Sequence, residues 1–136
     1  MTPDPLIATA TEARTKAFAP FSLFRVGAAL EAPDGTVIPG CNVESASYGL
    51  TMCAERVAVF AGVARGFRCF KRIAIVTDTP TPTPPCGACR QILWEFAPDG
   101  EVLLANLAGT VLRFTVRELL PHGFDAKQLG ESKPGT

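Results

Sequence analysis

The sequence LTMCAERVAVF, residues 50–60, places Cys53 two positions before Glu55 at the start of a segment rich in alanine and valine. This segment is apolar on most faces up to about residue 65 and is closed by Gly66, a pattern typical of a buried helix with a glycine cap. The Cys53 thiol could be an inert core group, a nucleophile or one ligand of a metal ion. The choice between these roles depends on which other side chains the fold brings to the start of this helix.

A second cysteine motif, PCGACRQILWEFAP at residues 85–98, also begins a predicted helix, which must end near Pro98. Cys86 and Cys89 are three positions apart and lie on one helical face, so both sulfurs can reach one ion. The preceding prolines set the first turn, where free N–H groups and the helix dipole favour thiolates. Taken alone, this pair is compatible with a thioredoxin-type redox pair, half of a zinc site, or two thiols packed against the helix.

The other segments alternate between strand and helix patterns. A helix is expected at residues 5–18, and a hairpin is expected where two β-rich runs flank the turn PDG at residues 33–35. Further strands are predicted at residues 71–78, 101–109 and 111–116, and a short helical or turn segment at residues 117–126. This order predicts a single-domain, three-layer α/β/α sandwich with a mixed sheet of about five strands, followed by a flexible tail from about residue 129.

Composition narrows the classes of function. Hydrophobic residues make up 47% and charged residues 19% of the 136 positions, which indicates a packed globular chain. The 13 basic and 13 acidic residues cancel, so the chain lacks the electrostatic pattern of a general nucleic-acid binder. No apolar run is long enough to span a bilayer, and the N-terminus lacks the basic and apolar regions of a signal peptide. We therefore expect a cytoplasmic protein without a nucleic-acid or membrane partner.

The five cysteines are an odd number spread over a mid-sized chain, which does not indicate a disulfide framework. If the starts of the two cysteine-bearing helices meet at one edge of the sheet, Cys53, Cys86 and Cys89 converge where anions are favoured. Three protein ligands leave zinc a fourth position for water, as in catalytic sites. Cys41 could instead close a structural site, although a small buried thiol is the default beside a strand, and Cys69 is expected in the core.

Glu55 could approach the open position of such a metal without being a ligand, and a carboxylate there would move protons. The alternative is an acidic residue that interacts only with the helix dipole. The order C-A-E followed by P-C-x-x-C matches the signature of zinc nucleobase deaminases. Each feature is weak alone, but together and in this order they are specific for that class.

Nearly the whole chain resembles the small, homotetrameric cytidine deaminases of the three-cysteine zinc type. The resemblance is carried by AFAPFSLFRVGAAL, GCNVESASYGLTMCAER, PCGACRQILWEF and LLPHGF, at residues 17–30, 40–56, 85–96 and 119–124. The family usually has tyrosine where Phe18 and Phe21 stand, a change that keeps both rings. The resemblance implies one cytidine deaminase domain over residues 1–136. It also implies hydrolysis of cytidine and/or deoxycytidine to uridine or deoxyuridine and ammonia, a reaction of pyrimidine salvage.

The resemblance further implies the roles of single residues. One zinc ion per chain would be held by three thiolates, those of Cys53, Cys86 and Cys89. Glu55 would take a proton from the attacking water and pass protons to ring N3 and to the leaving ammonia. Tyr48 and Phe124 would reach the site of a neighbouring subunit in a homotetramer.

Substrate contacts follow from the same resemblance. Phe24 would stack on the pyrimidine, while Asn42 and Glu44 would hydrogen-bond the ribose hydroxyls. Backbone groups near Ala54 and Cys86 would read the edge of the base. The residue types alone leave other roles open for the first three, namely a core aromatic, a turn residue and a solvated acid.

The charge of the site suggests a further hypothesis. Three thiolates on Zn²⁺ give a net charge of −1, which makes the metal a poorer Lewis acid and raises the pKa of its water. Arg56 could donate hydrogen bonds to the sulfurs and restore part of the positive field, although it could also be an ordinary surface arginine. Arg90, beside Cys89, is a weaker candidate for the same task, and His122 has no assigned role.

Several rival functions remain open from the sequence. A related deaminase could act on a blasticidin-type nucleoside, whereas a polynucleotide deaminase is disfavoured by the neutral charge. A structural zinc module would use Cys41 as its fourth ligand and would unfold without it. A disulfide oxidoreductase would exchange thiols and hold no metal tightly.

Overall fold

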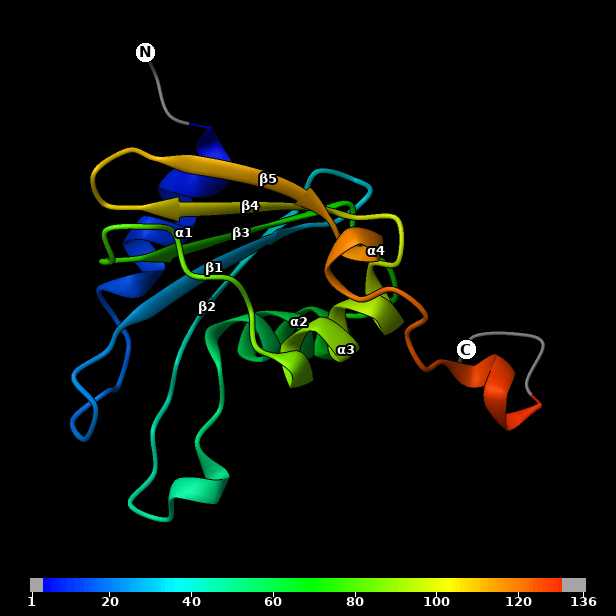
Figure 1. Ribbon diagram of the computed structural model, residues 1–136, viewed down its shortest axis with the longest axis horizontal. Helices are drawn as coiled ribbons and strands as arrows, with labels where there is room; N and C mark the ends of the chain where they lie inside the picture. The colour runs from blue at the N-terminus through cyan, green and yellow to red at the C-terminus, as the bar shows by residue number, and fades with distance from the viewer. Residues whose placement is uncertain (1–3, 131–136) are drawn as a thin grey trace.

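A five-stranded sheet forms the centre of the protein (Figure 1). The computed structural model describes residues 4–130. Within them the strands lie in the order β2-β1-β3-β4-β5, where β1 is Val26–Glu31, β2 Val37–Cys41, β3 Arg72–Thr77, β4 Glu101–Asn106 and β5 Val111–Thr115. Strands β3 and β4 are parallel, and the other neighbouring pairs are antiparallel. The predicted mixed sheet of about five strands is therefore confirmed.

Helices cover both faces of this sheet (Figure 1). Helix α1 (Pro5–Arg14) lies on one face, and α2 (Ala54–Ala64) and α3 (Gly87–Phe96) lie on the other. The shorter elements are α4 (Val116–Leu119) and the 3₁₀ segments Tyr48–Leu50 and Ala126–Leu129. The three-layer α/β/α sandwich expected from the sequence is confirmed. Within residues 4–130, no helix reaches the length and hydropathy that a bilayer span requires.

The two faces of the sheet bury two separate clusters of side chains, because successive residues of a strand point to opposite faces. In β3, Ile73 and Ile75 belong to the cluster beneath α2 and α3. Their neighbours Ala74 and Val76 belong to the cluster beneath α1. Since a central strand is covered on both faces, it reads as a continuous apolar run rather than as an alternating pattern.

Two glycines of the β1–β2 hairpin allow the helices to approach the sheet closely. A Cβ atom at Gly27 would lie 1.9 Å from the carbonyl oxygen of Ala10, in α1. A Cβ atom at Gly40 would lie 2.6 Å from the carbonyl oxygen of Ala54, at the start of α2. Because glycine has no side chain, Gly27 and Gly40 allow one helix on each face to pack directly against the strands.

The first helix is shorter than predicted. It ends at Arg14 rather than at residue 18, because the chain turns away to pair with the segment that follows β2. The Phe18 N–H donates to the carbonyl of Asn42 at 3.0 Å, and the Glu44 N–H donates to the carbonyl of Phe18 at 2.8 Å. This pairing places residues 18–26 beside residues 42–44.

Predictions for three other local features, namely the cap of α2, the burial of Cys69 and the C-terminal segment, have different outcomes. The glycine cap of α2 is confirmed, because Gly66 has a φ of +99° and donates to the carbonyl of Val63. Cys69 is exposed rather than in the core, because the adjacent Phe70 takes the buried position there. Leu129, at the start of the predicted flexible tail, belongs to a 3₁₀ segment, and residues 131–136 lie outside the described residues.

We expect Gly27→Ala and Gly40→Ala each to lower the free energy of unfolding by about 1–3 kcal/mol or more, because the new methyl group meets helix backbone that cannot rotate away. The matched control is Gly49→Ala, whose Cβ meets no atom within 4 Å and should change stability by less than about 0.5 kcal/mol. Urea denaturation of the three variants at one protein concentration measures the difference. Equal stability of Gly27→Ala and Gly49→Ala would contradict this account of α1 packing.

Candidate active site

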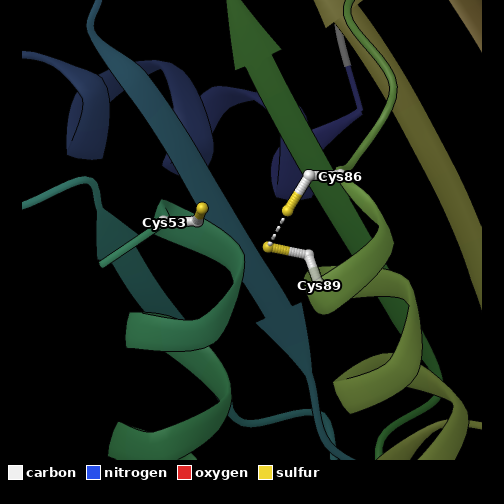
Figure 2. A group of neighbouring side chains, drawn as sticks. All are labelled: Cys53, Cys86 and Cys89. Carbon is white, nitrogen blue, oxygen red and sulfur yellow. Dashed lines mark hydrogen bonds between the residues drawn. The ribbon is translucent and has the colours of Figure 1, made fainter. Parts of the chain in front are cut away.

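Three cysteine side chains converge from the starts of α2 and α3 (Figure 2). Cys53 is the N-cap residue of α2, Cys86 is the N-cap residue of α3, and Cys89 lies in the first turn of α3. The three sulfur atoms lie within 4.8 Å of one another, and the sulfurs of Cys86 and Cys89 are 3.5 Å apart. The predicted convergence of the two helix starts is therefore confirmed.

The geometry and charge of this cluster fit a metal with three thiolate ligands. Zinc–sulfur bonds of about 2.3 Å place sulfurs roughly 3.8 Å apart in a tetrahedral site, close to the separations here. Neither N-cap side chain accepts a capping hydrogen bond from the backbone of its own helix, so first-turn N–H groups and both helix dipoles favour negative charge on the sulfurs. A hydrogen bond from Cys89, helped by Arg56, lowers the pKa of the Cys53 thiol to about 5.

Within residues 4–130, no second group of three or more histidine, cysteine or acidic side chains is placed to hold a metal. Cys41 stays outside the cluster, half-buried at the end of β2. The cluster therefore offers three ligands and leaves a fourth position open, which is the arrangement of catalytic rather than structural zinc sites.

Glu55 is buried beside the thiols, with 5% of its surface exposed. It lies in the first turn of α2 and lines the same cavity as Cys53 and Cys86. Burial raises the pKa of its carboxyl group, and the nearby Cys53 thiolate adds to this effect. The carboxyl group thus faces the site, in contrast to an exposed acid that interacts only with the helix dipole.

A cavity of about 280 Å³ lies next to the thiols, at the carboxyl end of β3. Its walls bring together residues from five separate parts of the sequence. Seven of the residues predicted for the site line it, namely Phe24, Asn42, Glu44, Cys53, Ala54, Glu55 and Cys86. A volume of this size suits one small molecule.

Asn42 and Glu44 line one part of the cavity and also fasten the segment that carries Phe24. The Asn42 side chain accepts from the Val26 N–H at 2.8 Å and donates to the Phe24 carbonyl at 2.7 Å. The Glu44 carboxylate accepts from the Phe21 N–H at 2.9 Å. Since Asn42 and Glu44 flank the bridge residue of the strand-like segment after β2, they face the same way, as the sequence predicted.

Tyr48 and Phe124 do not line this cavity. Tyr48 is 75% exposed and makes an edge contact with Phe21, whose ring centroid is 5.9 Å away. Phe124 is 53% exposed and lies beyond α4, where the Gln91 side chain hydrogen-bonds both its carbonyl and its N–H. Both aromatic rings therefore lie outside the cavity of their own chain.

Helix α3 holds the segment around Phe124 at several points. A Cβ atom at Gly123 would lie 2.5 Å from the Trp94 ring, so the chain passes directly over the indole. The Trp94 Nε1–H donates to the Asp125 carboxylate at 3.4 Å. Arg90, considered above as a partner of the sulfurs, instead donates to the carbonyls of Pro85 and Leu119, each at 2.8 Å.

Arg56 reaches the thiols from α2. Its guanidinium Nη2 lies 3.5 Å from the Cys53 sulfur, and hydrogen bonding to that sulfur raises the pKa of the arginine. Its Nε is buried and has no partner among residues 4–130. The side chain is therefore turned toward the sulfurs rather than out to solvent. His122, exposed at the far end of the chain, has no contact with the cluster.

Sequence reasoning missed several hydroxyl groups of the cavity. Thr77 ends β3, and its Oγ1 lies 2.9 Å from that of Thr79 and 3.3 Å from that of Thr83. Asn106 donates to the carbonyl of Thr79 at 3.0 Å, so the proline-rich loop that leads to Cys86 is fixed to the sheet. A threonine in a proline-rich run carries no distinctive signal, which is why these contacts appear only in three dimensions. Ser22, beside Glu44, was missed for the same reason.

An α/β/α sandwich that gathers three thiols, a buried carboxyl group and a small-molecule cavity at two helix starts defines a metal-dependent enzyme with an open coordination position. A family model described as the cytidine and deoxycytidylate deaminase zinc-binding region matches residues 2–105. The chain therefore belongs to the family of zinc-binding cytidine and deoxycytidylate deaminases. The three-cysteine zinc site predicted from the sequence, with one ion per chain, is confirmed.

Individual relatives agree with this membership. The chain is 51% identical over 127 residues to the cytidine deaminase of Halalkalibacterium halodurans, across 93% of this chain and 96% of that protein. The crystal structure of cytidine deaminase from Burkholderia pseudomallei matches with a TM-score of 0.88 at 51% identity, across 91% of this chain and 100% of that chain. The blasticidin-S deaminase of Bacillus cereus is more distant, 31% identical across 71% of this chain and 74% of that protein.

The ligand set predicts how zinc content responds to cysteine substitution. Cys89→Ser should lose the metal, because it removes one of three ligands, whereas Cys41→Ser should retain about one zinc per chain. Elemental analysis after dialysis measures the metal, and melting curves with and without a chelator measure its contribution to stability. Loss of zinc from Cys41→Ser would instead make that thiol a fourth ligand and the site a structural one.

Proposed function

We propose that this protein hydrolyses cytidine and/or deoxycytidine to uridine or deoxyuridine and ammonia, in the cytoplasm, as a step of pyrimidine salvage. The observation that carries the proposal is the buried Glu55 beside three converging thiols in a cavity of about 280 Å³. Family membership and the cytidine deaminases at about half identity support the choice of substrate. We also propose that one deaminase domain spans residues 1–136.

Zinc held by Cys53, Cys86 and Cys89 would lower the pKa of bound water to about 7 and so supply a nucleophile at neutral pH. Water adds to C4 of the ring, ring N3 gains a proton, and the C4–N4 bond breaks as ammonia leaves. Glu55 passes the first proton of the water to N3 and then passes the second, from the hydroxyl group now bonded to C4, to the leaving amino group. The burial of Glu55 in the cavity that Cys53 and Cys86 also line supports this role.

The remaining walls of the cavity bind and orient the nucleoside. Phe24 offers a partly exposed ring for stacking on the pyrimidine. The backbone N–H groups at the uncapped starts of α2 and α3, near Ala54 and Cys86, hydrogen-bond the polar edge of the base. Asn42 and Glu44, which also line the cavity, bind the ribose hydroxyls.

We further propose a homotetramer in which Tyr48 and Phe124 complete the cavity of a neighbouring subunit. Both rings are exposed and lie outside the cavity of their own chain. Two further exposed apolar side chains lie near Tyr48: Phe21, which is 48% exposed and contacts the Tyr48 ring, and Leu50, which is 72% exposed and belongs to the same 3₁₀ segment. An exposed apolar surface of this kind is typical of a protein–protein interface.

The decisive experiment removes the proton shuttle. Glu55→Ala and the isosteric Glu55→Gln should keep zinc and lose at least about 10²-fold in kcat, because one acid/base group contributes roughly 10²–10⁴-fold. The fall in ultraviolet absorbance of cytidine measures turnover, and the product is identified as uridine. Glu12→Gln, an exposed glutamate on α1, is the matched control and should leave turnover unchanged.

Two results would contradict the proposal. Near-normal turnover in Glu55→Gln would remove Glu55 from the reaction. A wild-type protein that holds one zinc per chain but leaves both cytidine and deoxycytidine unchanged would exclude these substrates and direct the search to other cytosine nucleosides.

We propose that Arg56 offsets the negative charge of the three thiolates through its hydrogen bond to Cys53. Arg56→Gln should weaken zinc binding or lower kcat by about 10–100-fold, the range typical for partners of metal ligands. Competition with a zinc chelator measures the affinity, and cytidine turnover measures the rate. Arg65→Gln, at the exposed end of the same helix, is the control. Unchanged affinity and turnover in Arg56→Gln would show that this arginine does not tune the metal site.

A further inference from the structure

The Glu44 carboxylate receives its hydrogen bonds from one short stretch of chain. The N–H groups of Phe21 and Ser22 donate to its Oε1, at 2.9 and 3.1 Å. The Ser22 hydroxyl donates to its Oε2. The carboxylate therefore does not extend freely into solvent, as the sequence alone allowed, but is held by three donors.

The Ser22 hydroxyl also accepts a hydrogen bond, from the Phe24 N–H at 3.0 Å. A tight turn makes this contact possible, because Leu23 has a φ of +62° and donates to the carbonyl of Ala19 at 3.0 Å. A left-handed conformation is unfavourable for leucine and persists only where its surroundings hold it in place. The hydroxyl is thus a link between the Glu44 carboxylate and the backbone of Phe24.

The three donors do different work. Two N–H groups on one oxygen fix the position of Oε1 but leave the carboxylate free to rotate about that atom. The hydroxyl on Oε2 removes this rotation and fixes the plane of the group. A carboxylate has about four acceptor sites, so three filled sites leave one for a further donor. Since Ser22 and Glu44 both line the cavity, one sugar hydroxyl is the donor that suits this site.

We infer that Ser22 is a positioning residue for sugar recognition, which orients the Glu44 carboxylate toward one ribose hydroxyl and ties it to the segment that carries Phe24. The inference rests on the proposed nucleoside substrate and adds a residue to it. The hydrogen bond from the Ser22 hydroxyl also lowers the pKa of the Glu44 carboxyl group. Ser22 acts through its hydrogen bond to the Glu44 carboxylate and needs no contact with the pyrimidine ring.

The test compares Ser22→Ala with Ser22→Thr, which retains a hydroxyl, and with Ser47→Ala, an exposed serine whose side chain does not cap its own 3₁₀ segment. In Ser22→Ala the KM for cytidine should rise about tenfold, because one hydrogen bond to a charged group is lost from the support of the carboxylate. The kcat should stay within about twofold, since the lost contact is equal in the ground and transition states. Ser22→Thr should restore most of the affinity, and Ser47→Ala should resemble the wild type.

Two further readouts separate positioning from a general effect on the fold. The Ser22→Ala penalty should vanish for 2′,3′-dideoxycytidine, measured as a substrate or as a competitive inhibitor, because this nucleoside has no 2′- or 3′-hydroxyl to bind. It should also largely vanish in the Glu44→Ala background, which has no carboxylate for Ser22 to orient. Zinc content and melting temperature of every variant confirm that the protein is folded and loaded.

Each outcome decides between the hypotheses. If the wild type converts cytidine but Ser22→Ala has the KM of Ser47→Ala, the positioning role is wrong while the proposed function stands. The same holds if the penalty persists undiminished with 2′,3′-dideoxycytidine or in the Glu44→Ala background, or if kcat falls while KM is unchanged. A zinc-loaded wild type without activity on cytidine or deoxycytidine overturns the proposed function, and the sugar-recognition role falls with it.

Discussion

The close approach of α2 to the hairpin at Gly40 is the constraint on which the site depends. Any side chain at that position would meet the backbone of α2 at Ala54 and Ala58, so the helix can settle at this depth only over a glycine. Cys53 is the residue directly before α2, so the position of its sulfur depends on the position of the first turn of this helix. Because the thiols must lie within a few ångströms of one another to share an ion, a small shift of α2 would separate Cys53 from the two thiols of α3.

Much of this architecture could be predicted from the sequence, because the signals are local. The Asp-Gly turn, the run from Arg72 to Thr77 and the glycine after α2 each report a backbone preference that the structure confirms. The spacing of Cys86 and Cys89 places two ligands on one helical face by geometry alone. The convergence of Cys53 on this pair followed from a general rule about helix starts at sheet edges rather than from any single residue.

The rest depended on contacts between distant parts of the chain. The sequence pattern extends α1 to Phe18, whereas the helix ends at Arg14. The backbone of Phe18 pairs instead with that of Asn42 and Glu44, more than twenty residues away, and no local pattern reports this pairing. Arg90 could not be separated from Arg56 by position, since only the packing of residues 85 and 119 shows where its guanidinium goes. Ser22 gave no signal at all, because a serine between aromatic and aliphatic residues is common in turns. Hydrogen bonds such as those of Arg90 and Ser22 join distant parts of the chain and can be seen only in the folded structure.

The attachment of residues 119–125 to α3 ties two distant features of the protein to one helix. Much of this segment lies outside any helix or strand, and it is held by hydrogen bonds to Arg90, Gln91 and Trp94. Its shape therefore depends on α3 being folded. Helix α3 also carries Cys89, so one short helix supports both a metal ligand and the position of the Phe124 ring. A local opening of α3 would consequently disturb the metal ligands and this exposed aromatic surface together.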